Sequence, residues 1–270
     1  MTARKKKKIW LTFLSGAIAF YFFWTCLPSP LFITPTSTVL EDRNGELLGA
    51  LIAQDGQWRF PYNKNVTEKF KKAIVRFEDK RFYHHPGFDV IAIARAAWQN
   101  LHSRKVKSGG STLSMQVIRL SRKGKERSIW QKIIEAIMAL RLELGYSKEE
   151  ILCLYASQAP FGNNVVGLDA AAWRYFGKNA ELLSWGQTAT LAVLPNSPSL
   201  VHLGKNRDVL LNKRNRLLDN LSEAGEIDST TCELAKAEPL PGKPLALPQY
   251  APHLLARTYL ENFSKGGQLG

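Results

Sequence analysis

The chain has 270 residues, of which 45% are hydrophobic, and a formal net charge of +14. This length allows one large folded domain with appendages, and the charge favours anionic partners such as phosphates, nucleic acid or an acidic membrane surface. The three cysteines include no Cys-x-x-Cys pair, which argues against a disulfide framework and a thiolate metal site.

A basic cluster, residues 4–8, precedes an uncharged apolar run, residues 9–27. At 1.5 Å per residue this run spans roughly 28 Å, enough for the hydrocarbon core of a bilayer. A cleaved signal peptide is the alternative, but the run is long and no small-x-small cleavage site precedes Pro28. We expect an uncleaved transmembrane anchor, with residues 1–8 in the cytoplasm and the rest of the chain outside.

Residues 28–65 are predicted to form a linker and a short β segment, with strands near 38–40, 46–52 and 57–60. Asn44-Gly45 and Asp55-Gly56 are hairpin signals between these strands. A helical domain is expected over 66–225, followed by a Pro-rich tail, 226–270. Its predicted helices are residues 67–77, 90–101, 111–122, 128–144, 147–156, 169–176, 185–194 and 206–224.

The segment EDKRFYHHPGFD, residues 78–89, places Glu78 at the end of a predicted helix, just before a histidine-rich loop. Glu78 and Asp79 could be a solvated acidic pair on a basic face. The functional interpretation is a general base whose ionised form neighbouring cations stabilise. His84 and His85 are adjacent and make a weak metal pair, so we expect a loop histidine that supports the site.

The segment SGGSTLSMQ, residues 108–116, is a glycine-rich loop that opens into a helix. Free backbone N–H groups and the helix dipole favour an anion at such a position. A flexible loop with a serine cap is the alternative. The segment lacks the Lys-Ser/Thr ending of a nucleotide P-loop.

Residues 127–144 (RSIWQKIIEAIMALRLEL) give the strongest physical signal. Apolar residues cover most of this helix's circumference, so we expect it to be buried. Lys132 and Glu135 are three residues apart and share a face. A carboxylate inside a buried helix needs a partner or a function, which leaves a structural Lys132–Glu135 pair and a site carboxylate as the two interpretations.

Together these segments resemble the peptidoglycan glycosyltransferase domain of class A penicillin-binding proteins, glycosyltransferase family 51, with its 1C branch the most similar. Residues 78–89 match the pattern ED-x-x-F-x-x-H-x-G. Residues 109–116 resemble GGST-x-T-x-Q, with Ser114 in place of the second Thr. Three further blocks resemble the family at residues 127–143, 147–178 and 183–198. Gln131 and Ser157 depart from the family's Arg and Asn, and no Ser-x-x-Lys of a transpeptidase is present.

The resemblance implies a mainly α, lysozyme-like glycosyltransferase domain with a small β element and one N-terminal transmembrane helix. It implies an inverting transferase outside the bacterial inner membrane that polymerises lipid II, with Glu78 as the general base and Glu135 as a second carboxylate. The implied substrate-binding positions are Asp79, His85, Ser111, Thr112, Gln116, Arg119, Arg127 and Lys132.

The resemblance also bears on cofactors and partners. No cofactor is certain, and Glu135 is a candidate ligand for a divalent cation, Mg²⁺ or Mn²⁺. The expected partners are lipid II, the growing glycan strand, the membrane and other cell-wall synthesis proteins; nucleic acid is disfavoured because the body of the chain lies outside the cell.

Two other functions compete with this interpretation. A hydrolase would use Glu78 as a general acid, which requires an apolar site, whereas lysines and arginines surround Glu78 in the sequence. A catalytically degenerate protein could bind lipid II or act as a scaffold, an alternative motivated by Gln131 and Ser157.

Overall fold

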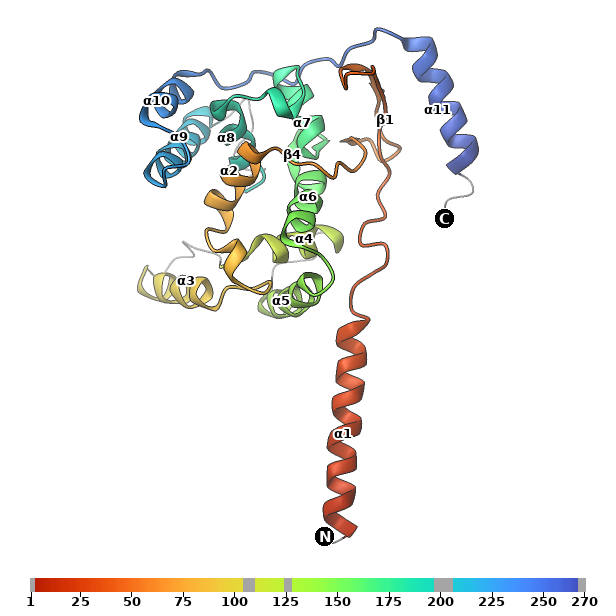
Figure 1. The fold of residues 1–270 in the computed structure, drawn as a ribbon, viewed down its shortest axis with the longest axis vertical. Helices are drawn as coiled ribbons and strands as arrows, with labels where there is room; N and C mark the ends of the chain where they lie inside the picture. Colours follow the sequence, from red (N-terminus) through yellow and green to blue (C-terminus); the bar gives the residue numbers. More distant parts are fainter. Residues whose placement is uncertain (1–2, 104–109, 124–127, 197–205, 267–270) are drawn as a thin grey trace. The chain divides into compact units, whose positions relative to one another are not determined.

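The computed structural model describes residues 3–103, 110–123, 128–196 and 206–266, which are mainly helical, as the sequence predicted (Figure 1). The α-helices are α1 Ala3–Trp24, α2 Glu68–Glu78, α3 Val90–Ser103, α4 Leu113–Ser121, α5 Ile129–Glu143, α6 Lys148–Gln158, α7 Leu168–Phe176, α8 Trp185–Val193, α9 Arg207–Glu223, α10 Ser229–Ala237 and α11 Pro252–Gly266. The 3₁₀ helices are η1 Phe82–His84 and η2 Ala180–Leu182, and the strands are β1 Thr38–Glu41, β2 Leu47–Leu51, β3 Trp58–Arg59, β4 Pro160–Gly162 and β5 Val165–Val166.

The chain divides into two compact units, each described by itself. Unit 1 consists of residues 1–33 and 82–151, and unit 2 of residues 34–81 and 152–270. Unit 1 therefore contains α1, η1, α3, α4, α5 and the start of α6. Unit 2 contains the strands, α2, the end of α6, η2 and α7 to α11.

Local sequence signals explain the helix starts. Thr67 caps α2 by accepting a hydrogen bond from the Phe70 N–H, and Ser184 with Gln187 forms a capping box at α8. Ser147 and Glu150 exchange hydrogen bonds at the start of α6, as predicted. At α4 the cap is Thr112, not Ser111, so the helix begins two residues later than predicted.

The core of unit 2 is the packing of α2, α8, α9 and α10. Phe70 and Ile74 of α2 are almost completely buried there, as are Leu217 and Leu218 of α9. Arg214 is also fully buried, and its guanidinium donates to the carbonyls of Lys236 and Glu238 at the end of α10. A buried charge is tolerated when its donors are satisfied, so this arginine fixes α9 to the end of α10.

The strands of unit 2 form two small sheets. In the first, β1 pairs antiparallel with β2 through the predicted turn at Asn44-Gly45. The predicted second hairpin is wrong, because β3 pairs in parallel with β5 in a separate sheet. The tail was expected to be Pro-rich, and α11 within it was not predicted; this helix packs on β1 and β2.

In unit 1, α4 packs against α5. The prediction that α5 is buried on most of its circumference is wrong. Only one stripe, Glu135, Met138, Ala139 and Leu142, is buried, whereas Ile129 and Trp130 are 80% and 74% exposed. Among the described residues of unit 1, none covers the apolar side chains Ile133 and Ile137, which are 44% and 48% exposed, so an apolar sequence did not mean a buried helix.

The predicted anchor falls on α1, which begins at Ala3, just before the basic cluster, and ends at Trp24, three residues before the predicted end. Arg141 of α5 donates from Nε to the Trp24 carbonyl, and its guanidinium carbon lies 4.1 Å from the centre of the Trp24 ring. Within the described part of the chain, none of the helices combines the length and hydropathy needed to cross a membrane.

Candidate functional site

Glu78 is the last residue of α2 and is partly buried. Its Oε1 accepts a hydrogen bond of 2.8 Å from Nδ2 of Asn196, an exposed residue that follows α8. Because α2 packs on α8, the end of one helix brings the carboxylate to the end of the other. The sequence did not indicate Asn196 as a site residue, although it lies within the family-like block at residues 183–198. Asp79, which was predicted as a substrate-binding residue, is buried.

Tyr155 of α6 is a second residue that the sequence analysis did not identify as functional. Its hydroxyl is buried and has no hydrogen-bond partner among the described residues. Burial raises the pKa of Tyr155 well above its ordinary value, and the charge of Glu78 adds to this shift. The hydroxyl therefore keeps its proton in the field of the Glu78 carboxylate. A buried hydroxyl without a partner is uncommon and marks a candidate position for contact with a ligand or water.

Glu135 on α5 is 5% exposed and is held by Arg119 of α4. The guanidinium Nε donates to Oε1 at 3.0 Å and Nη2 donates to Oε2 at 2.6 Å, a bidentate geometry that is stronger and more directional than a single ion pair. Nη2 also reaches the Ser111 hydroxyl at 3.3 Å. Of the two interpretations that the sequence left open, the Lys132–Glu135 pair is not seen: Glu135 pairs with Arg119, and Lys132 is exposed.

The histidine loop and the glycine-rich loop meet in unit 1. Thr112 donates its hydroxyl proton to the Gly87 carbonyl, and His85 is buried with Nδ1 accepting from the Gly87 N–H. Gly87 has a φ of +103°, and a Cβ added there would lie 2.6 Å from the Ala139 backbone of α5. Only glycine allows this approach, so the HHPG sequence fixes the loop on α5.

A buried polar network that the sequence analysis missed supports the same loop. Glu143 accepts from the Ser114 hydroxyl at 2.5 Å and from Lys148 Nζ at 2.7 Å. Lys148 also donates to the His85 carbonyl at 2.7 Å. Its residues come from α4, α5 and α6, which is why no local pattern predicted it.

The remaining predicted residues are accounted for as follows. Gln116 lies on α4 and is partly buried, and Arg127 lies outside the described residues. Glu78 and Asp79 fall in unit 2, whereas Glu135, Arg119, Lys132, His85, Ser111, Thr112 and Gln116 fall in unit 1.

The donor set does not fit a divalent cation at Glu135. Both carboxylate oxygens accept hydrogen bonds from Arg119, and the guanidinium is itself a cation. Over the described residues, no group of three His, Cys, Asp or Glu side chains could hold a metal ion. Hard cations such as Mg²⁺ require several oxygen ligands, which this arrangement does not offer.

Comparisons with known proteins identify the family. A family model described as Transglycosylase matches residues 44–222. Penicillin-binding protein 1C of Escherichia coli (strain K12) is 37% identical over 232 residues, 83% of this chain and 29% of its own length. Penicillin-binding protein 1A of Aquifex aeolicus (strain VF5) is 32% identical over 248 residues, 90% of this chain and 34% of its own.

Among solved structures, penicillin-binding protein 1A from Haemophilus influenzae aligns with 87% of this chain and 25% of its own, at 18% identity and a TM-score of 0.43. The chain spans about a third of the length of these curated relatives. The chain belongs to the transglycosylase family, which confirms the peptidoglycan glycosyltransferase domain that its motifs predicted.

Proposed function

We propose that this chain polymerises lipid II into glycan strands and that Glu78 is the general base. The observation that carries the proposal is the partly buried Glu78 carboxylate, which ends α2 and accepts a hydrogen bond from the Asn196 amide. The carboxylate is only partly buried and is therefore accessible to an incoming hydroxyl. The Tyr155 hydroxyl, which has no partner among the described residues, lies close enough in unit 2 for the charge of Glu78 to raise its pKa further.

In the proposed reaction, the 4-hydroxyl of an incoming lipid II attacks the anomeric carbon of the growing strand. The new C1–O4 bond forms as the bond from C1 to the pyrophosphate oxygen breaks, so the configuration at C1 inverts. Glu78 takes the proton of the attacking hydroxyl. Polyprenyl pyrophosphate leaves with the bonding electron pair, and nearby cations stabilise its charge.

We assign the remaining predicted residues to the donor side of the reaction. Lys132 is exposed on α5 and offers an ammonium group for the leaving pyrophosphate. Arg119 carries a charge that Glu135 already balances, so the pair would orient the glycine-rich loop through Ser111. Thr112 and Gln116 lie at the start of α4, where the Thr112 hydroxyl donates to the Gly87 carbonyl. His85 supports the histidine-rich loop, and its carbonyl accepts from Lys148.

The test is a polymerisation assay with purified chain and lipid II. We expect Glu78→Gln to lower the rate by about 10³-fold, because removing a general base costs roughly 10²–10⁴-fold. Glu68→Gln is the matched control, since Glu68 is an exposed acid at the other end of the same helix; it should leave the rate unchanged. Wild type that binds lipid II without forming polymer would support the degenerate binding protein instead, and shortened glycan would support a hydrolase.

The proposal places unit 1 at a lipid surface. Large apolar side chains of α3 and α5 are exposed, among them Val90, Trp98, Leu101, Ile129 and Trp130, and α1 joins a basic cluster to an apolar run. Exposed apolar area with adjacent positive charge favours anionic lipid.

Flotation with anionic vesicles should be weakened by Trp130→Glu but not by Leu182→Glu, a 60% exposed control in unit 2. Equal flotation of both variants would contradict this placement.

A further inference from the structure

Unit 2 contains a cavity of about 380 Å³ that the proposed reaction does not use. This volume falls in the range of small-ligand sites, roughly 300–1,000 Å³. The walls come from β1, the loop that follows β3, helix α7 and the turn before η2. Asp169 and Trp173 are four residues apart on α7 and therefore present one face to the cavity.

The floor of this cavity is apolar and aromatic. Phe60 and Trp173 are each 8% exposed, and Ala180 is 5% exposed. Tyr62, at the edge, is 45% exposed and offers part of its ring to solvent. Aromatic rings that remain partly accessible can pack against the C–H faces of a ligand.

The polar groups around this floor include both donors and acceptors. Asn63 donates from Nδ2 to Asp169 Oδ2 at 3.2 Å. The Asn179 side-chain oxygen accepts from the Glu181 N–H, which leaves its Nδ2 group as a donor. Lys64 adds a cationic donor and Glu41 an anionic acceptor. Glu41 and Asp169 would repel an anionic ligand, and Lys64 would repel a cationic ligand. Lining groups of both signs therefore favour a neutral ligand with many hydrogen-bonding groups.

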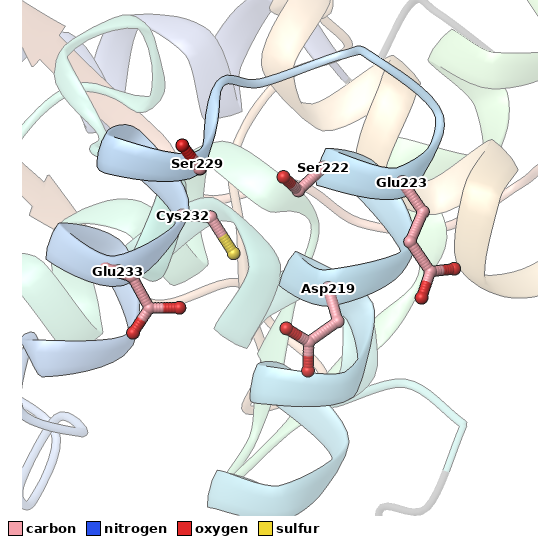
Figure 2. A pocket seen from close by; sticks show the side chains of 6 residues that line it. All are labelled: Asp219, Ser222, Glu223, Ser229, Cys232 and Glu233. Carbon is pink, nitrogen blue, oxygen red and sulfur yellow. The ribbon is translucent and has the colours of Figure 1, made fainter.

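A second cavity, between α9 and α10, differs from this one because its carboxylates form ion pairs within the chain. Figure 2 shows its six lining side chains: Asp219, Ser222, Glu223, Ser229, Cys232 and Glu233. Its carboxylates already hold an internal cation, since Lys236 Nζ lies 2.5 Å from Asp219 Oδ1 and 2.8 Å from Glu233 Oε1. Asp169 has no such partner: over the described residues it forms no ion pair, and burial raises its pKa, with the charges of Glu41 and Glu181 adding to the shift.

We propose that the cavity beside β1 and α7 is a saccharide-binding site, with the aromatic floor under the sugar ring and the Asp169, Asn63 and Asn179 side chains around its hydroxyls. Sugar hydroxyls both donate and accept, which matches the mixed wall. A neutral sugar also needs no compensating charge from the chain. This inference is independent of the roles proposed for Glu78 and Glu135.

The experiment is ligand-observed NMR titration of the intact chain with a trimer of β-1,4-linked N-acetylglucosamine, with maltotriose as a second saccharide. We expect saturable binding that becomes about tenfold weaker in Tyr62→Ala and Asp169→Ala, because each removes a main contact of the sugar. Tyr250→Ala is the matched control, as Tyr250 is 77% exposed and does not line the cavity. Spermidine is titrated in parallel as a cationic competitor.

Each outcome decides the proposal. Saturable binding that is lost in Tyr62→Ala and retained in Tyr250→Ala and Glu78→Gln supports it. No saturable binding of either trisaccharide, equal binding to Tyr62→Ala, or displacement by spermidine overturns it. Tyr62 is an exposed residue, so Tyr62→Ala remains informative if Asp169→Ala fails to fold. Lipid II polymerisation by Tyr62→Ala should equal that of wild type, which separates this result from the test of Glu78.

Discussion

Glu78 in unit 2 and Glu135 in unit 1 were predicted as a pair of site carboxylates, yet their surroundings differ. Glu135 is 5% exposed and both of its oxygens accept from one guanidinium. Glu78 is partly exposed, and its Oε1 accepts from the exposed amide of Asn196. The two residues share a chemical type but not an environment.

This difference separates two uses of a carboxylate. Glu135 is buried in a bidentate ion pair, so removing either side chain would leave the other charge without its counter-charge. Glu78 is partly exposed at the end of α2 and is accessible to a substrate hydroxyl, which suits the proton transfer proposed for it. Glu135 is suited to holding the Arg119 guanidinium and the glycine-rich loop in place.

The largest effect expected from this comparison is on the stability of unit 1. Arg119→Ala leaves the Glu135 carboxylate buried without a partner, which should lower the free energy of unfolding by about 3 kcal/mol. Glu135→Gln leaves a partly exposed arginine that water can solvate, so its loss should be about 1 kcal/mol. Urea unfolding followed by tryptophan fluorescence measures both.

The control for this prediction is the other carboxylate. Glu78→Gln should leave the unfolding midpoint nearly unchanged, and the double variant Arg119→Met with Glu135→Leu should regain most of the stability lost in Arg119→Ala. If Glu78→Gln and Arg119→Ala destabilise the chain equally, the proposed distinction between the two carboxylates is wrong.

An intermediate effect is expected at Asn196. Asn196→Ala removes the amide donor to Glu78 and should lower kcat/KM for lipid II polymerisation about fivefold, the usual scale for one exposed hydrogen bond. Asn212→Ala, an exposed position on α9, is the control. If Asn196 acts through Glu78, Asn196→Ala in the Glu78→Gln background should cause no further rate loss; an equal loss in both backgrounds would argue that Asn196 is only structural.

Features determined by adjacent residues were predictable from the sequence. The caps at Thr67 and Ser184 depend on hydrogen bonds within four residues, which is why the starts of α2 and α8 were predictable. The β1–β2 hairpin depends on its own Asn-Gly turn. Family-like motifs then indicated Glu78 and Glu135 as site residues, because such motifs carry information beyond local propensity.

Features determined by distant contacts were not predictable. The partner of β3 is β5, more than a hundred residues away in sequence, and the partner of Glu135 lies on another helix. The exposure of Trp130 depends on what covers α5, which apolar periodicity does not report. α11 was missed because Pro-rich flanking sequence masked a helix that packs on β1 and β2.

Asp169 combines features of the two carboxylates and gives the smallest predicted effect. It is partly buried, whereas Glu135 is 5% exposed, and its Oδ2 accepts from the Asn63 amide. Burial raises its pKa, and the charges of Glu41 and Glu181 act in the same direction while Asn63 opposes them. A raised folded-state pKa gives stability that is present below the unfolded pKa and is lost as the pH rises through the folded pKa.

Asp169→Asn removes this ionisation and should therefore gain stability relative to wild type as the pH rises, by less than about 1 kcal/mol at neutral pH. Thermal unfolding from pH 3 to pH 8 measures the difference, with Asp208→Asn as an exposed control that should show no such trend. A pH-independent difference would mean that the amide of Asn63, rather than burial, decides the charge of Asp169.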